Sequence, residues 1–433
     1  MATKRTRVLA QLRGGSTLAV AMGVMNVASY LFTILAARLL GPRGYGAFAA
    51  LMGLLLVIMV ASLALQATAA RRIVATPDHV HQIERVILRV GVQAALGLGL
   101  LCLVLSPVID QVIRLDSLGT AALVAFAAVP VTLMGAQAGI LQGERRWSAL
   151  SLIYVAAGVP RLVIGTVMIV SWPTEFAALL GVTIAAYAPV LVGWLALRRP
   201  RDPGEPSEEH RVGALWNETF HNSHALLGFF ALSNVDILVA RNVLGEQQAG
   251  LYAGGLILVK AVLFLPQFVV VLAFPSMGVA ESRLRTLIQS LAGVGVIGVM
   301  VAVGVTVLSG WAILFVGGIQ YSAIDGSLWA FALLGCVLAM LQIVVYSVLA
   351  RQARKSVFLL WAGLLAVIGL GSLADTFTEL LRTVLAVDSS VLVVLVMISL
   401  WALRHPSDPS VGGRVPARTR PDRDVKRHGE RRG

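Results

Sequence analysis

The chain has 433 residues, of which 58% are hydrophobic and only 13% are charged, and its formal net charge is +13. A soluble protein of this length needs far more polar surface to stay dispersed. A mean hydropathy of +0.84 therefore excludes a soluble globular protein and places the chain among all-α polytopic membrane proteins.

About 20 helical residues cross a hydrocarbon core about 30 Å thick. The first segment is too long for a signal-peptide core and lacks a small-residue cleavage site, so we expect it to be retained. The connection before the last segment is crowded by Asp375, Glu379, Arg382 and Asp388. Twelve predicted membrane segments lie at about 16–37, 46–69, 86–106, 119–141, 149–171, 176–197, 218–240, 250–274, 286–308, 326–349, 355–373 and 381–403.

The basic residues predict the orientation of these segments. Of the 35 Lys and Arg residues, 28 lie on the side shared by both termini and 5 on the other. Cytoplasmic loops are enriched in such residues, so we expect both termini in the cytoplasm. The 31 Arg against 4 Lys residues suggest a GC-rich bacterial genome, so the expected location is a bacterial inner membrane. The net charge then reflects topology and does not indicate a nucleic-acid partner.

The segments predict two six-helix lobes and three polar regions. The stretch RRPRDPGEPSEEHR (198–211) is rich in proline and charge and has no apolar periodicity, which indicates a linker. The expected C-terminal tail is basic, polar and disordered. The predicted regions are a cytoplasmic N-terminus (1–15), an N-lobe (16–197), a cytoplasmic linker (198–213), a C-lobe (214–403) and the tail (404–433).

Two short stretches indicate an internal repeat. LGPRGYGAFA (40–49) and LGEQQAGLYA (244–253) share Leu-Gly, a later glycine, an aromatic residue and alanine, and each follows an Ala-Arg pair. Six helices per half is an even number, so both halves enter the membrane from the same side. Parallel repeats around a pseudo-twofold axis along the membrane normal occur in one class of transporters, and two lobes able to rock favour a transporter over a channel.

Arg161 is the clearest charged residue at membrane depth, near the middle of 149–171 and directly after Pro160. A charge at the bilayer centre costs about 2.5–3.5 kcal/mol on insertion scales, which makes it a functional candidate. Its guanidinium either faces an inter-lobe cavity and grips phosphate oxygens, or forms an ion pair inside the lobe.

Lys260 and Asp236 lie on neighbouring predicted helices and are expected to approach each other across the hairpin. Three interpretations of Asp236 stay open. It is a structural partner of Lys260 or Arg241, a proton or sodium site that couples transport to an ion gradient, or a substrate contact. Asn234 is grouped with it because it lies two residues earlier.

Four further polar residues belong to the candidate cavity. Asn26 lies in the first helix of its repeat, and Arg38 ends that helix. His221 and His224 are three residues apart, hence on one helical face, where interfacial and proton-relay roles both stay open.

Several catalytic patterns are missing from the sequence. It contains no G-x-x-x-x-G-K-[ST], H-E-x-x-H or G-x-S-x-G motif. The two cysteines, Cys102 and Cys336, fall inside apolar segments and indicate neither a disulfide nor a metal site. We expect no enzyme activity, no metal and no cofactor.

The hairpins carry a family resemblance. The stretch AARLLGPRGYGAFAALMGLLLVI (36–58) resembles the first hairpin of the multidrug/oligosaccharidyl-lipid/polysaccharide exporter superfamily. The stretch NVDILVARNVLGEQQAGLYAGGLILVKAVLFLPQFVVVLAFP (234–275) is similar to the corresponding seventh and eighth helices. The chain is most similar to its bacterial oligosaccharide flippases. A third, weaker resemblance is carried by ILFVGGIQYSAIDGSLWAFALLG (313–335), which is similar to the tenth helix of the family and the loop before it.

This resemblance implies two six-helix bundles in a V that work by alternating access. It also implies a polyprenyl-pyrophosphate-linked sugar as substrate, driven across the membrane by ion gradients or potential. Arg161 and Lys260 fit the cationic cavity residues thought to hold the pyrophosphate, although no strict motif carries them over. The expected partners are the lipid-linked sugar, membrane lipids, and polysaccharide polymerases or glycosyltransferases.

Two other functions stay open at this point. A cation-coupled multidrug exporter also has twelve helices, but it favours an acidic, aromatic-lined cavity. A non-transporting scaffold for polysaccharide assembly would use the basic tail for docking. Peptidoglycan-precursor flippases commonly have fourteen helices, for which this chain has no room.

Overall fold

A computed structural model of the chain describes residues 2–199, 210–263, 283–350 and 357–404. These residues are almost entirely helical and include no strand. The elements of the first half are α1 (Ala2–Ala75), a 3-10 turn (Pro77–His79), α2 (Val80–Val104), α3 (Ser106–Ile113), α4 (Leu118–Gly143), α5 (Trp147–Ser171) and α6 (Glu175–Leu197). Those of the second half are α7 (Val212–Val243), α8 (Glu246–Leu263), α10 (Arg283–Val307), α11 (Ser309–Val316), a 3-10 segment (Ile319–Ser327), α12 (Leu328–Ala350), α13 (Val357–Gly371) and α14 (Phe377–Arg404).

The predicted all-α membrane architecture is confirmed. Within the described ranges, nine helices are long and apolar enough to cross a membrane, and the longest, Gly15–Ala75, contains two predicted segments. Each of the twelve predicted segments falls mainly on helix, and their residues 264–274 and 355–356 lie outside the described residues. The segment 86–106 crosses the break between α2 and α3, and the segment 355–373 ends two residues after α13. The count of twelve crossings itself stays a prediction.

Gly41 divides α1 into two helices. Its φ of 67° and ψ of 175° are not helical, and Pro42 follows it. Only glycine adopts such a positive φ at no steric cost. Proline is favoured in the first turn of a helix because it has no backbone N–H group, and an N–H at that position would lack a partner within the helix. The Leu-Gly-Pro sequence therefore makes the turn of the first predicted hairpin.

The order of elements extends the repeat beyond the hairpins. Helices α2 and α10 are both 25 residues long, and each is followed by a short helix of 8 residues, α3 or α11. The sequence analysis did not predict these short helices. The hairpins also meet in space, since a Cβ on Gly46 would lie 3.0 Å from the Cα of Gly250. These two glycines occupy equivalent positions in the two aligned stretches. A contact between equivalent positions is expected where a pseudo-twofold axis passes between the halves.

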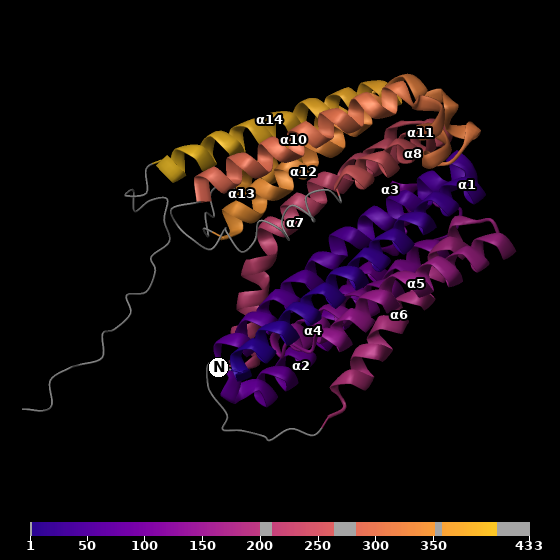
Figure 1. Ribbon diagram of the computed structural model, residues 1–433. Coiled ribbons are helices and arrows are strands. Elements are labelled where there is room, and N and C mark those ends of the chain that lie inside the picture. Colours follow the sequence, from indigo (N-terminus) through magenta and orange to yellow (C-terminus); the bar gives the residue numbers. More distant parts are fainter. Residues whose placement is uncertain (1, 200–209, 264–282, 351–356, 405–433) are drawn as a thin grey trace, which may run out of the picture.

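Figure 1 shows the helices in two groups, α1–α6 and α7–α14. The groups diverge toward the end of the molecule where the N-terminus lies, and they approach each other at the end that holds α3, α8 and α11. Close packing within the groups depends on small residues. A Cβ on Gly135 would lie 2.1 Å from the Ser62 backbone oxygen, and one on Gly255 would lie 2.3 Å from the Phe331 ring.

The start of α7 packs against the first group. Glu218 forms ion pairs with Arg71 and, at 2.6 Å, with Arg72, and Leu215 is buried. His210, placed in the predicted linker, is only 2% exposed, and its Nδ1 lies 3.0 Å from the Arg72 guanidinium. The end of the linker is therefore an ordered contact with α1, and the helix begins six residues before the predicted 218.

Asp388 was counted among the charges that crowd the connection before the last segment, although the predicted segment 381–403 contains it. It lies inside α14, where its exposed fraction is 0%. Val384, Val391 and Leu395 are buried on the same stripe of the helix. The spacing 384, 388, 391, 395 is that of a core-facing helix surface, so this periodicity is the signal that could have placed Asp388 in the interior.

Candidate functional site

The α7–α8 hairpin brings Lys260 and Asn234 together. The Lys260 Nζ donates a hydrogen bond to the Asn234 Oδ1 at 2.7 Å, and the Asn234 Nδ2 donates to the Phe230 carbonyl at 2.8 Å. Asn234 is 3% exposed. The second bond orients the amide so that its oxygen faces the ammonium. Among the described residues, no carboxylate lies within ion-pair distance of Lys260.

Asp236 has other partners than those considered from sequence. Its Oδ2 accepts a hydrogen bond from the Tyr252 hydroxyl at 2.9 Å, and its Oδ1 accepts one from the Ile237 amide at 2.8 Å. Neither Lys260 nor Arg241 forms an ion pair with it in the described part of the chain. Both Asp236 and Tyr252 are buried.

Asp388 lies near this pair and was missed by sequence reasoning. Neither of its carboxylate oxygens has a hydrogen-bond partner among the described residues. It is close enough to Asp236 and Tyr252 for their charges to interact. An unpaired carboxylate inside the protein is costly, so two buried acids near one tyrosine form a group suited to taking up a cation.

Arg161 projects from the side of α5 that faces α1. Gly158 and Gly165, one turn away on either side, pack against Met25 and Phe32 of α1. The Arg161 Nη2 lies 4.0 Å from the Met52 Sδ. No carboxylate within the described ranges pairs with Arg161, so the internal ion pair considered from sequence is not seen there.

The two cations are connected to neighbouring residues of α1. Met52 contacts Arg161, and the next residue, Gly53, packs against Asn234, whose Oδ1 would lie 3.6 Å from a Cβ at that glycine. Asn234 in turn accepts from Lys260. Cations from the two helix groups therefore approach the seam between α1 and α7–α8.

Arg241 and Arg38 hold the two groups together at the end where they meet. The Arg241 guanidinium donates to the carbonyls of Ile113 and Arg114, at 2.8 and 2.6 Å, at the end of α3. Arg38 donates to the Leu314 carbonyl of α11. The last carbonyls of a helix lack partners and carry partial negative charge, so an arginine is a suitable cap.

The remaining candidates lie away from this seam or beside it. Asn26 is half-buried one turn before Tyr30, whose hydroxyl donates to the Ile257 carbonyl of α8 at 3.4 Å. His224 is exposed, and its ring packs against those of Phe220 and Trp361. The side chain of His221 lies outside the described residues.

Known structures share this fold. An inward-facing structure of a multidrug resistance MATE family transporter of the MOP superfamily is 15% identical, with a TM-score of 0.65 over 89% of this chain and 96% of that chain. An outward-facing structure with the same description is 13% identical, with a TM-score of 0.58 over 90% and 96%. A MOP superfamily transporter from Pyrococcus furiosus is 14% identical, with a TM-score of 0.52 over 91% and 96%. At such identities the likeness shows the fold alone.

A family model extends the comparison to the sequence. No curated protein matches the chain. The model described as polysaccharide biosynthesis protein matches residues 11–281, which is more than half of the chain. This multi-pass membrane protein with the fold of MOP-superfamily transporters therefore belongs to the polysaccharide biosynthesis protein family.

Proposed function

We propose that the chain is a flippase that moves a polyprenyl-pyrophosphate-linked oligosaccharide across the bacterial cytoplasmic membrane for cell-surface polysaccharide synthesis. Family membership supports the pathway, and the likeness to MOP-superfamily structures supports transport. In this proposal residues 16–197 and 214–403 are the moving lobes, and both termini are cytoplasmic. Polysaccharide polymerases and glycosyltransferases are its proposed partners.

The observation that carries the proposal is the pair of cations without carboxylate partners beside the inter-group seam. Burial of an incompletely compensated charge costs several kcal/mol per ion. Lys260 hydrogen-bonds to an amide oxygen, and Asp236 is near enough for the two charges to interact but, among the residues that the structure describes, forms no ion pair with it. A pyrophosphate supplies anionic oxygens to both Arg161 and Lys260. Charge compensation by substrate is a reason to keep two such side chains in a membrane protein.

The way the groups meet supports alternating access. Equivalent glycines touch at one end, while the groups diverge at the other (Figure 1). Separation of the Gly46–Gly250 contact would open this end as the other closes, in keeping with the higher TM-score of the inward-facing neighbour. The head group would pass through the seam while the polyprenyl tail stays in lipid.

Coupling is assigned in this proposal to Asp236 and Asp388. Uptake of a proton or sodium ion would relieve the cost of two buried carboxylates. Because Asp236 lies two residues after Asn234, which holds Lys260, a change in charge at one site alters the field at the other. A membrane potential adds about 2.3 kcal/mol per elementary charge per 100 mV.

The head-group role is tested by flipping of a fluorescent polyprenyl-pyrophosphate sugar in proteoliposomes. Arg161→Gln and Lys260→Gln should each slow flipping at least about tenfold, the effect of losing about 1.4 kcal/mol of interaction. Arg382→Gln is the matched control, because Arg382 is an exposed cation of α14. If both variants flip the lipid at the wild-type rate, the head-group role is refuted. If the wild-type protein exports cationic drugs but flips no lipid, a multidrug exporter is favoured instead.

The coupling role needs a separate measurement. The same assay is run with and without an imposed proton or sodium gradient, for wild type, Asp236→Asn and Asp388→Asn. The proposal expects wild type to respond and the variants to flip lipid without responding. A variant that folds and still follows the gradient refutes the coupling role of that carboxyl group.

A further inference from the structure

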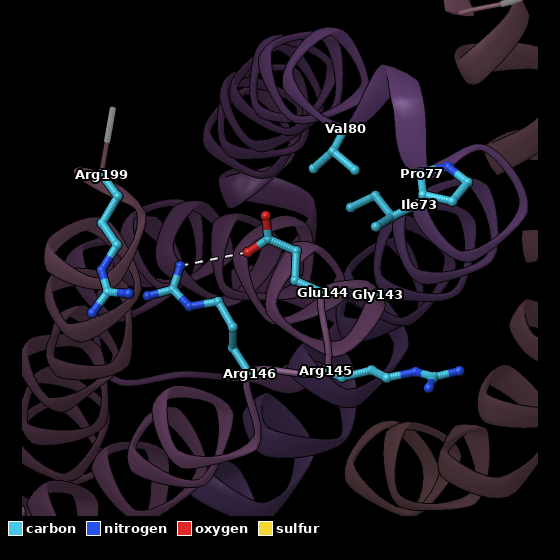
Figure 2. A pocket seen from close by; sticks show the side chains of 8 residues that line it. All are labelled: Ile73, Pro77, Val80, Gly143, Glu144, Arg145, Arg146 and Arg199. Atoms are coloured by element: carbon cyan, nitrogen blue, oxygen red, sulfur yellow. Dashed lines mark hydrogen bonds and ion pairs between the residues drawn. The ribbon is translucent and has the colours of Figure 1, made fainter. Parts of the chain in front are cut away.

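A cavity lined by both charged and apolar side chains lies away from the seam, where α1, α4 and α6 end. Its volume is about 510 Å³. In Figure 2 the Arg146 and Arg199 side chains lie on one side, three apolar side chains lie on the other, and Glu144 lies between them. The lining residues are Ile73, Pro77, Val80, Gly143, Glu144, Arg145, Arg146 and Arg199.

Arg146 is held in place by the protein. Its Nη2 donates to the Ala196 carbonyl at 2.7 Å, and its Nη1 lies 3.5 Å from the Glu144 Oε2. Its side chain is 23% exposed. Arg199 follows the end of α6 and is exposed. One guanidinium is thus fixed and the other is free to adjust to a ligand.

The cavity carries an excess of positive charge. Glu144 is the one acidic residue among the eight that line it, against three arginines. Burial raises the pKa of Glu144 above its ordinary value, although Arg146 and Arg199 oppose the shift. Arg145 adopts a left-handed φ of 59°, a backbone conformation uncommon for residues other than glycine.

The shape and charge fit one class of ligand. Guanidinium groups bind phosphoryl oxygens through two parallel hydrogen bonds. The apolar wall of Ile73, Pro77 and Val80 fits the carbon part of an amphipathic molecule. A volume of 510 Å³ is within the range of small-molecule pockets, about 300–1,000 Å³.

We propose that this cavity binds a phosphoryl anion, with Arg146 and Arg199 as its ligands, and that the apolar wall favours an anionic phospholipid by contacting the carbon part next to its phosphate. In the proposed orientation the site lies at the cytoplasmic leaflet. It is separate from Arg161 and Lys260 and does not depend on the transported substrate.

The test uses the full chain in nanodiscs of phosphatidylcholine with and without phosphatidylglycerol. Hydrogen exchange of the amides of 141–150 reports on the site locally, so basic residues elsewhere do not contribute. Phosphatidylglycerol should protect these amides in wild type. Arg199→Ala should raise the half-saturating lipid content about tenfold, Glu144→Gln should lower it, and Arg89→Ala, an exposed arginine outside the cavity, should leave it unchanged.

The two sources of phosphate are separated by competition. Protection that inorganic phosphate does not reverse assigns the site to the lipid head group, and protection by inorganic phosphate alone assigns it to a soluble anion. Equal protection with and without each anion overturns the proposal. So does an Arg199→Ala response equal to that of wild type, since opposite shifts in the Arg199 and Glu144 variants are the signature of an anion site.

Discussion

The contact between the two halves at Gly250 gives the sharpest prediction of the conformational account. A Cβ at Gly250 would lie 1.8 Å from the Pro42 carbonyl oxygen and 2.2 Å from its carbon. These are backbone atoms and cannot rotate away. Overpacking of this kind costs about 1–3 kcal/mol, and here only in a conformation where α1 and α8 meet.

Gly250→Ala should therefore shift the equilibrium toward the state in which this end is open. A cost of about 2 kcal/mol corresponds to about a 30-fold change in the ratio of the two states. Gly46→Ala should give a smaller shift, because its Cβ would lie 3.0 Å from the nearest atom. Gly245→Ala is the control, since a Cβ there meets nothing within 4 Å.

Distances between spin labels at Ser171 and Leu373 measure this shift. Both positions are exposed, Ser171 at the end of α5 and Leu373 two residues after α13, in the two helix groups. The native Cys102 and Cys336 are buried, which limits competing labelling. Gly250→Ala should lengthen the mean label distance relative to Gly245→Ala. If both variants give the wild-type distribution, the halves do not separate at Gly250 and the reasoning is refuted.

Three further predictions concern stability, each measured by thermal unfolding in detergent. Arg241→Ala removes a buried cation bonded to two helix-terminal carbonyls and should lower the free energy of unfolding by about 3 kcal/mol. Arg38 is exposed, so Arg38→Ala should lower it by less than about 1 kcal/mol. Equal losses in the two variants would contradict this reasoning from burial. Gly135→Ala places a Cβ 2.1 Å from a backbone oxygen of α1 and should destabilise by about 1–3 kcal/mol, while Gly97→Ala, with open space around it, should not. Asp388→Leu should stabilise by about 1–3 kcal/mol, because it removes a buried carboxylate that lacks a described hydrogen-bond partner; destabilisation would indicate that the carboxylate is satisfied.

The sequence was informative where hydrophobicity alone decides the structure. Apolar length placed the helices, and the shared Leu-Gly hairpin pattern indicated the repeat that the matching α2–α3 and α10–α11 elements extend. The short helices α3 and α11 were not predicted, although each begins with a recognised break signal, Ser106-Pro107 or Ser309-Gly310. The sequence analysis used apolar length alone and did not use these dipeptides to end one helix and begin another.

The candidate site was harder to predict, because partners are set by helix rotation and not by sequence distance. The sequence placed Lys260 near Asp236, yet its ammonium bonds to Asn234 one half-turn away. Tyr252 was not considered as the partner of Asp236, although both are buried. Asp388 was counted with the charges of a connection, although it falls within the predicted segment 381–403, because its helical periodicity was not considered. Side-chain pairing between helices requires the packed structure.

The central claim is that cations at the seam act on an anionic head group. The direct measurement compares flipping by the wild-type protein of two lipids with the same sugar and polyprenyl chain, one linked by pyrophosphate and one by a neutral linker. The account predicts that the wild-type protein flips the pyrophosphate lipid only. In the Lys260→Gln variant, the flipping rate of the pyrophosphate lipid should fall toward the rate of the neutral lipid. Equal flipping of both lipids, or of neither, would contradict it.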